Sequence, residues 1–330
     1  MATLGFEVEW FDTISKLVQK LFLKVYLEDN TVEILREQKK PPFLNRIFFP
    51  DLTFSDLFIG NSVTIFNRIL TIKAYANSTT IEYMKSREVH YLCALHAEAI
   101  NKCGDILNLC KEFNLEIGRV KTCTYGIIGS FSVSDGDILL ELVGFTKSNI
   151  QTVLSTAEAI TSKLAIDVME AESIEDVIGT GRNFRISTPC TVCVIKPHVF
   201  KDKHVGDIVK HIIDSGFQLK GLVSLYFNTE MVEEFFGVYR GAFPSYNAMA
   251  THLVSGPCLA LLITGNSPDL VNEFRELCGP VEPEVASTLR PNTIRALYGR
   301  DLIKNAVHCT DLAEDSEMEA KFLFEILGNF

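Results

Sequence analysis

The 330-residue sequence has no run of eighteen apolar residues and no positively charged, apolar leader at its amino terminus. A transmembrane helix requires the first feature and a secretory signal peptide the second. We therefore expect no membrane partner. The nine cysteines, an odd number without regular spacing, do not form a disulfide framework, so the sequence predicts a reducing intracellular compartment.

Basic residues are also in short supply, with 31 lysines and arginines against 42 acidic residues and a formal net charge of -11. Proteins that bind bulk nucleic acid gather lysine and arginine against the phosphates, so the charge excludes that class of partner. An anionic ligand would need a local basic pocket. A GxxxxGK[S/T] loop is absent too, which excludes a P-loop nucleotide site.

The sequence contains one CxxC pair, Cys190 and Cys193, in the stretch TPCTVCVIKP. These β-branched residues indicate a buried strand, where positions three apart point to opposite faces. No second CxxC completes a zinc site. We interpret the pair as core cysteines and expect no metal ligands.

Residues 1–87 show the short alternating segments of an antiparallel β domain. The stretch KLFLKVYLEDNTVEIL predicts two strands around a turn at Asp29 and Asn30, because both residues tolerate left-handed backbone conformations. The stretch NSVTIFNRILTIKAY predicts a second strand pair.

Residues 88–184 and 185–330 repeat one plan of strands and helices, so we expect two α/β units produced by internal duplication. The first contains HYLCAL, GDILNLCKEFN and DILLELVG, and the second CTVCVIKP, VGDIVKHIIDSGFQ and CLALLIT. The second unit is longer, mainly through a polar stretch from Gly279 to Asp311. Chemistry is commonly carried by such loops on a scaffold.

The longer unit holds a set of residues suited to phosphoryl transfer. Cations stabilise the spread charge of that transition state, and a neutral imidazole can relay the phosphoryl group while a carboxylate orients its other nitrogen. A single histidine in a polar turn is nevertheless more often structural, so from spacing alone both interpretations stand. The set consists of Lys196, Arg275, Arg295, Asn305, His308 and Glu319.

The residues after His308 predict that it lies in a turn at the start of a helix. Asp311 and Glu314 have capping-box spacing. An apolar face is predicted for this helix from Met318, Phe322 and Ile326, with Glu319 about two turns in.

The stretches CVIKP, SGP, LRPNTIRALYG and NAVHCTDLAED, in this order, resemble a nucleoside diphosphate kinase domain over residues 188–330. The resemblance implies a ferredoxin-like fold with His308 as the phosphorylated histidine and Glu319 as its carboxylate partner. It also implies nucleotide binding, with Mg²⁺ accompanying the nucleotide if the domain is active. The implied phosphate and ribose contacts are Lys196, Arg275, Arg295 and Asn305.

The resemblance weakens on the nucleoside side of the site. The aromatic residue that stacks on the base falls at Pro244, the tyrosine beside the histidine at Phe236, the phosphate-contacting threonine near Val281, and the glycine after the histidine at Cys309. The first copy is more degenerate: His96 and Ala97 replace Lys-Pro, and no histidine occurs from residue 97 to 197. That copy is expected to serve as a packing module.

With LEDNTVEIL and LFIGNSVTIFNR in its first domain, the whole chain resembles the homologue 7 type of this family. The resemblance implies an α+β protein with a DM-type, pleckstrin-homology-like β barrel followed by two kinase-like folds, the first degenerate. It further implies binding to tubulin, neighbouring axonemal inner proteins and the γ-tubulin complex, in the doublet microtubule lumen of cilia and flagella or at the basal body and centrosome.

These features leave three hypotheses open. The first is a structural microtubule inner protein with weak or no kinase activity. The second is an active nucleoside diphosphate kinase that transfers a γ-phosphate from ATP or GTP through phospho-His308. The third is a nucleotide sensor without turnover.

Overall fold

The computed structural model describes residues 3–12, 15–36, 41–50, 52, 57, 59, 62–86, 88–113, 115–123, 126–128, 131–144, 147–169, 186 and 188–327. The chain divides into two compact units, Met1–Val89 with Gly144–Lys147, and His90–Val143 with Ser148–Phe330. We call them the first and second unit. The domain boundaries predicted at residues 87 and 184 lie outside the described residues.

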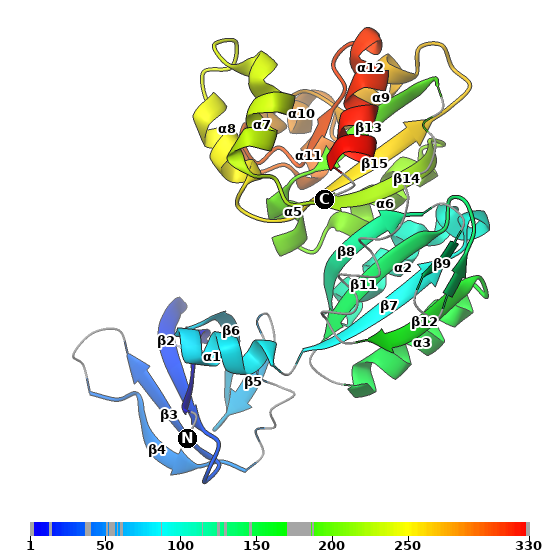
Figure 1. The fold of residues 1–330 in the computed structure, drawn as a ribbon. Coiled ribbons are helices and arrows are strands. Elements are labelled where there is room, and N and C mark those ends of the chain that lie inside the picture. The colour runs from blue at the N-terminus through cyan, green and yellow to red at the C-terminus, as the bar shows by residue number, and fades with distance from the viewer. Residues whose placement is uncertain are drawn as a thin grey trace. The chain divides into compact units, whose positions relative to one another are not determined.

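Six strands of the first unit form an antiparallel half-barrel sheet in the order β4-β3-β2-β1-β6-β5 (Figure 1). One face of this sheet is the core of the unit, where Leu4, Phe6 and Ile72 are fully buried. The elements are β1 (Thr3–Asp12), β2 (Leu17–Tyr26), β3 (Thr31–Arg36), β4 (Leu44–Phe48), β5 (Ser62–Ile65), β6 (Arg68–Tyr75) and helix α1 (Ser78–Lys85).

Both predicted strand pairs are present, and each hairpin depends on left-handed turn residues. Between β2 and β3, Asn30 has a φ of 50°, and the Asp29 carboxylate accepts a hydrogen bond from the backbone N–H of Thr31 at 3.2 Å. Between β5 and β6, Phe66 and Asn67 have φ values of 45° and 62°. Positive φ at both central residues matches the twist of a two-residue hairpin.

An eight-stranded sheet in the order β12-β7-β11-β8-β14-β15-β13-β16 runs through the second unit. Counted outward from the junction of β8 with β14, the earlier strands follow the order β8-β11-β7-β12 and the later strands the order β14-β15-β13-β16. In both halves the second strand of the sequence lies at the junction, followed by the third, the first and the fourth. A short separate hairpin, β9 (Gly126–Ile128) with β10 (Phe131–Val133), precedes β11. The sheet strands are β7 (Val89–Leu95), β8 (Glu116–Thr122), β11 (Ile138–Gly144), β12 (Leu164–Met169), β13 (Cys190–Ile195), β14 (Gln218–Leu225), β15 (Cys258–Thr264) and β16 (Val307–Cys309).

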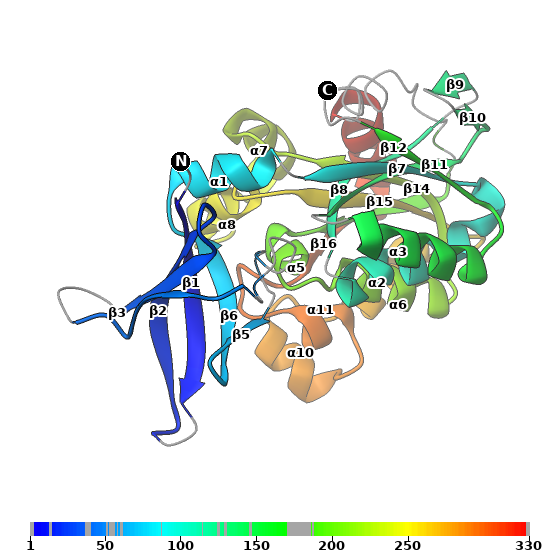
Figure 2. The same ribbon diagram turned by 90° about the horizontal axis from the view of Figure 1, so that it is seen from below.

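Helices cover this sheet, with α2, α3 and α6 along one face (Figure 2). In the later half, a buried cluster joins Val192 of β13 with Phe236, Leu253 and Leu323 from three helical segments. Among the described residues no helix is long and apolar enough to cross a bilayer. The helices are η2 (Ala97–Lys102), α2 (Cys103–Glu112), α3 (Lys147–Ile160), α5 (Pro197–Lys201), α6 (Val205–Asp214), α7 (Thr229–Phe236), η3 (Gly237–Tyr239), α8 (Tyr246–Leu253), α9 (Leu270–Cys278), α10 (Pro283–Leu289), α11 (Ile294–Tyr298), η4 (Ala313–Asp315), α12 (Ser316–Lys321) and η5 (Phe322–Ile326).

The two halves of the sheet meet through hydroxyl groups as well as backbone. The Thr122 Oγ1 of β8 accepts a hydrogen bond from the backbone N–H of Leu222 at 2.7 Å, and the Ser224 Oγ of β14 accepts one from the N–H of Val120 at 2.8 Å. Each edge strand therefore supplies one side chain that satisfies the backbone of the other.

Helices α2 and α6 pack together below this junction in an equally reciprocal way. A Cβ on Gly104 would lie 2.6 Å from the backbone nitrogen of Lys210, and one on Gly206 would lie 2.6 Å from that of Asn108. Only glycine permits this approach. Ion pairs of 2.8 Å join Lys210 to Asp105 and Lys111 to Asp207.

Candidate functional site

His308 lies in a strand rather than in the polar turn that the sequence predicted. Strand β16 pairs antiparallel with β13, and His308 lies opposite Val194. The backbone N–H of Lys196 donates to the carbonyl of Ala306 at 2.9 Å and continues the pairing. Backbone hydrogen bonds to β13 therefore outweigh the local turn signal and hold the backbone of His308 in an extended conformation.

The prediction for the following helix is also wrong in phase. The turn η4 intervenes, so α12 begins at Ser316 and Glu319 lies in its first turn. Consequently Met318 and Ile326 are exposed, at 64% and 52%, while Leu323 is buried. The Asp311 side chain does not cap this helix but binds Tyr239 and Arg275.

The predicted pair His308 and Glu319 is brought together. Its closest approach, from His308 Nε2 to Glu319 Oε1, is 3.6 Å, an ion-pair distance that exceeds a normal hydrogen bond. Within the described part of the chain, buried His308 Nε2 and Glu319 Oε2 have no hydrogen-bond partner. Leaving such atoms unpaired is costly, so a small approach of the two groups would be favourable.

Three aromatic rings enclose the imidazole edge-on. The ring centroids of Phe236, Phe235 and Tyr239 lie 5.1, 5.6 and 6.2 Å from that of His308. These rings exclude water from one side of the histidine. Phe236, which the resemblance placed at the family's tyrosine, thus occupies the wall beside His308.

Lys196 and Asn305 form a second predicted pair. Lys196 follows β13, and its Nζ donates to Asn305 Oδ1 at 2.7 Å and to the carbonyl of Ile303 at 3.1 Å. The Asn305 amide in turn donates to the Val281 carbonyl at 3.0 Å. Burial, with a smaller contribution from nearby Arg295, lowers the pKa of Lys196 to about 7.

Arg295 is a buried arginine whose donors are largely occupied. From α11 its Nη1 donates to the Gly279 carbonyl at 2.7 Å, and its Nη2 to the Val307 carbonyl at 3.2 Å and to Cys309 Sγ at 3.6 Å. Arg295 therefore binds both residues that flank His308 in β16, Val307 and Cys309.

Arg275, from α9, is half-exposed and lies farther out. Its Nη1 donates to the carbonyl and the carboxylate of Asp311, the latter at 2.7 Å. All six predicted residues thus gather around β16 and the segments beside it. The three cations, however, already have acceptors from the chain itself.

Sequence reasoning missed Tyr239 and gave Asp311 only the role of a helix cap. The Tyr239 hydroxyl donates a hydrogen bond to the Asp311 carboxylate. Burial, and then this bond, raise the pKa of Tyr239 above its usual range. Asp311 could have been noticed as a carboxylate three residues after His308, but its contact with Tyr239, 72 positions earlier in the sequence, leaves no local signal.

In the first copy, His96 precedes η2 at the position of the missing lysine. It is half-exposed, and its Nδ1 lies 3.3 Å from the Asp137 carboxylate. The Asp137 carboxylate is buried and also accepts hydrogen bonds from the backbone N–H groups of Ala97 and Ser134, so it ties this segment together.

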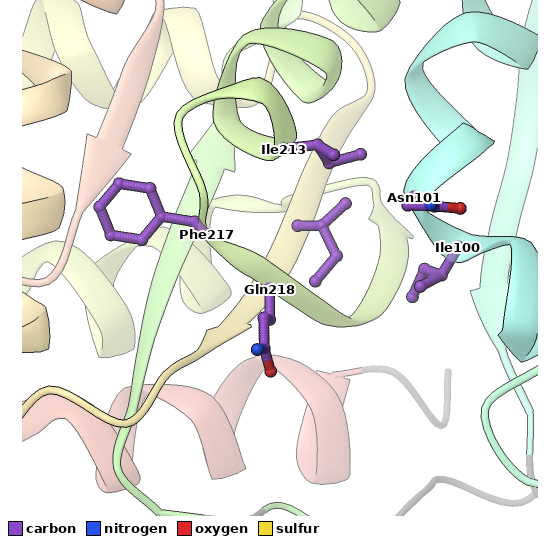
Figure 3. A pocket seen from close by; sticks show the side chains of 6 residues that line it. Ile100, Asn101, Ile213, Phe217 and Gln218 are labelled. Carbon is purple, nitrogen blue, oxygen red and sulfur yellow. The ribbon is translucent and has the colours of Figure 1, made fainter.

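A pocket of about 260 Å³ lies at the junction of the two halves of the sheet, and none of the residues that line it belongs to the predicted site. Figure 3 shows Ile100 and Asn101 on one side and Ile213, Phe217 and Gln218 on the other. Its lining is mainly apolar and offers no cation. In the described part of the chain no three His, Cys, Asp or Glu side chains gather to hold a metal ion.

The fold and this site can be compared with known proteins. Residues 189–327 match the family model described as nucleoside diphosphate kinase. Over 371 aligned residues the chain is 30% identical to the nucleoside diphosphate kinase homolog 7 of Rattus norvegicus, covering 98% of this chain and 93% of that protein. The chain belongs to the nucleoside diphosphate kinase homolog 7 family. It is an α+β protein whose carboxyl-terminal part has the nucleoside diphosphate kinase fold.

Shorter relatives match less than half of this homolog 7-like chain. The nucleoside diphosphate kinase of Aquifex aeolicus is 34% identical over 134 residues, which is 41% of this chain and 92% of that enzyme. A crystal structure of the Aquifex aeolicus enzyme covers 42% of this chain and 96% of its own, with a TM-score of 0.40.

Proposed function

We propose that this protein is a structural microtubule inner protein of axonemal doublet microtubules, built on nucleoside diphosphate kinase-like domains. The observation that carries the proposal is the state of the phosphate cations. Each of the three cations donates to an acceptor of the chain itself: Lys196 to Asn305, Arg275 to Asp311, and Arg295 to the carbonyl of Gly279. A nucleotide would have to compete with these partners, whereas a packing module needs them in place.

The surface of the first unit supports a docking role. The adjoining ends of β1 and β2 carry Phe11, Leu17 and Val18 at 52%, 61% and 56% exposure, and Ile69 of β6 is 62% exposed. Large apolar side chains gathered on a surface mark sites of protein interaction. We assign this patch to contacts with tubulin or neighbouring inner proteins.

The finer assignment of the domains belongs to the same proposal. The half-barrel would be a DM-type domain related to pleckstrin-homology barrels, with residues 1–87 as its extent. Residues 88–184 would be a degenerate kinase-like copy, which the shared strand order supports. The location would be the doublet lumen of cilia or flagella, with γ-tubulin complexes at the basal body or centrosome as further partners.

The site itself favours a second candidate, an active kinase. His308 and Glu319 lie side by side, Arg295 binds the carbonyl of Val307 next to His308, and Lys196 binds Asn305 three residues before it. Nucleophilic relay would take the γ-phosphoryl group from a nucleoside triphosphate onto His308 and pass it to a diphosphate. The family uses Mg-nucleotide when active. The residues here are cations that fit phosphate oxygens, so Mg²⁺ would arrive on the nucleotide.

A phosphohistidine assay separates the two candidates. The purified chain is incubated with γ-labelled ATP or GTP and Mg²⁺, and acid-labile label is counted for wild type, His308→Ala and the control His96→Ala. Rapid labelling lost only in His308→Ala would establish the kinase relay and refute a purely structural protein. Labelling at background in all three would exclude the enzyme.

Extraction of axonemes tests the location. An inner protein stays in the pellet after washing with high salt, because it is enclosed by the doublet wall. Release together with externally bound proteins would contradict the proposed site. Leu17→Asp should lower the retained fraction, whereas Leu289→Asp, an equally exposed residue of the second unit at 69%, should not.

A further inference from the structure

One end of the half-barrel sheet carries two arginines that lie against the same aromatic ring. Arg36 Cζ and Arg68 Cζ are each 5.1 Å from the ring centroid of Phe43, and Arg68 Cζ is 5.6 Å from that of Trp10. The Phe43 and Trp10 centroids are 5.3 Å apart. Because both guanidinium groups lie against one ring, they are at most about 10 Å from each other. We call these four residues the arginine cluster.

The strands place the arginine cluster where the buried face of the sheet ends. Alternate residues of β1, β3 and β6 are buried, and the same alternation continues into Trp10, Arg36 and Arg68. Phe43 is held beside β3 by the hydrogen bond from its backbone N–H to the Ile34 carbonyl at 2.8 Å. The cluster is therefore built near the ends of four strands and does not depend on a single loop.

Neither arginine of the cluster forms an ion pair with a carboxylate among the described residues. Arg46, the other described arginine of the first unit, also stacks on an aromatic ring, with its Cζ 3.6 Å from the Tyr26 centroid, but it forms a 2.7 Å ion pair with Asp29. Glu9 and Glu33 pair with lysines instead. In a chain with a net charge of -11, the cluster is therefore a small positive site without a counter-charge of its own.

A purely structural role does not account for the charges of the cluster. The aliphatic stems of the arginines cover the end of the core, as long charged side chains commonly do. Covering the core needs only the stems, however, and leaves most of the guanidinium donors without an acceptor. In the described part of the chain their one acceptor is the Phe66 carbonyl, 3.3 Å from Arg68 Nη1. An anionic partner would satisfy the remaining donors.

We propose that the arginine cluster binds an acidic peptide segment of a protein partner, with two of its carboxylates on Arg36 and Arg68. A guanidinium group can bind a carboxylate through two parallel hydrogen bonds, and the rings beside it exclude water from those bonds. In an extended peptide, side chains two residues apart lie on one face at a spacing of about 7 Å. That spacing is within the limit set for the two guanidinium groups. The inference does not depend on whether His308 carries a phosphate.

A short acidic peptide fits the charge of the chain better than a polyanionic surface does. A nucleic acid or an anionic membrane presents negative charge over a wide area, and the acidic remainder of the chain would repel it. An acidic peptide segment brings its charge only to the two arginines. The observations therefore favour a protein partner over a lipid surface or a nucleic acid.

Trp10 can report on binding directly, because it is the sole tryptophan of the chain. The full chain is titrated with a labelled peptide of alternating glutamate and glycine, or with its glutamine counterpart, while label anisotropy and tryptophan fluorescence are recorded. We expect saturable binding of the glutamate peptide that changes the tryptophan signal and weakens as salt is added. The glutamine peptide should not bind. Equal binding of both peptides, binding of neither, or binding that leaves the tryptophan signal unchanged would overturn the proposal.

Glutamine variants test the two arginines. In the double variant Arg36→Gln, Arg68→Gln, the dissociation constant of the glutamate peptide should rise about tenfold or more, because both charge-assisted contacts are lost. The matched control Arg46→Gln removes an arginine that already has Asp29 as its partner, so the constant should stay within about twofold of wild type. Circular dichroism checks that each variant is folded. Equal affinities of wild type and the double variant would contradict the proposed site.

A lysine variant keeps the test valid if the glutamine variant does not fold. Arg36→Lys, Arg68→Lys retains the stems and the charges but loses the planar forks, so we expect a smaller loss of affinity than in the glutamine variant. An affinity equal to that of wild type would overturn the bidentate contact. Vesicles containing phosphatidylserine are the last comparison. Binding of the chain to these vesicles in preference to the peptide would identify a lipid site and refute the proposal.

Discussion

Arg295 and Arg275 show how differently two residues of one predicted class are used. The sequence placed both at a phosphate, because both match arginines of the kinase motif. In the structure, Arg295 is buried at 8% exposure and donates to two carbonyls and a sulfur, whereas the Arg275 side chain is 40% exposed and binds Asp311 alone. The difference in burial determines how much each arginine contributes to the free energy of unfolding.

Arg295→Met should therefore destabilise the protein far more than Arg275→Met. The first change leaves the Gly279 and Val307 carbonyls without their donor, at a cost of about 2–4 kcal/mol. The second breaks a solvent-screened pair worth about 1 kcal/mol or less. Urea unfolding followed by far-UV circular dichroism measures the free energy of unfolding of both variants. Equal losses of unfolding free energy in the two variants would show that Arg295 does not stabilise the fold more than Arg275 does.

The histidine pair His198 and His252 makes folding sensitive to acid. His198 Nδ1 and His252 Nε2 lie 3.0 Å apart, an arrangement that requires one of the two nitrogens to be unprotonated. Burial, and then the neighbouring His252, lower the pKa of His198 to about 3. Burial, and then Lys196, lower that of His252 to about 4.

Because both folded pKa values lie below the unfolded value of about 6.5, the unfolded chain binds more protons between those limits. The stabilisation is fully present above pH 6.5 and is lost as pH falls toward 4. The free energy of unfolding should thus decline more steeply from pH 6.5 to 4.5 in wild type than in the double variant His198→Gln, His252→Gln. Parallel slopes would contradict this account.

At the scale of elements, the contact of α2 with α6 depends on two glycines at the same position of the repeated segments CGDIL and VGDIV. A Cβ at residue 206 would overlap the backbone of Asn108, and neither helix can yield without moving its half of the sheet. Gly206→Ala should cost about 1–3 kcal/mol, as overpacking does.

Gly237→Ala is the matched control for this variant. No heavy atom lies within 4 Å of a Cβ at that position, and its φ of -59° suits any residue. This change should leave stability within about 1 kcal/mol or raise it slightly. Thermal unfolding of the two variants side by side checks the prediction, which fails if Gly206→Ala is equally well tolerated.

The secondary-structure elements could be predicted from the sequence more completely than the pairing between them. Alternating residues identified β2, β3, β5 and β6, and the buried run of β13 was legible as a strand. The site residues were found through their order in motifs. The strand around His308 was missed, because its three residues gain their structure from β13, more than a hundred residues earlier. Long-range pairing of this kind leaves no local periodicity.

At the scale of the whole molecule, the second unit consists of two halves that share one strand order and one eight-stranded sheet. Each copy offers one sheet edge, and β8 and β14 conceal both edges within one chain. Thr122 and Ser224 seal the join with reciprocal hydrogen bonds. The earlier half therefore protects the edge strand β14 of the half that carries His308.

Removing the first copy should expose that edge. A fragment of residues 188–330 would present unpaired backbone groups of β14 and the bare Gly206 face of α6, and exposed edges promote pairing between chains. We expect this fragment to self-associate, whereas residues 88–330 should remain monomeric at the same concentration. Size-exclusion chromatography with light scattering measures both masses. A stable monomer of the short fragment would contradict this account, because it would show that β14 does not need β8 to prevent association between chains.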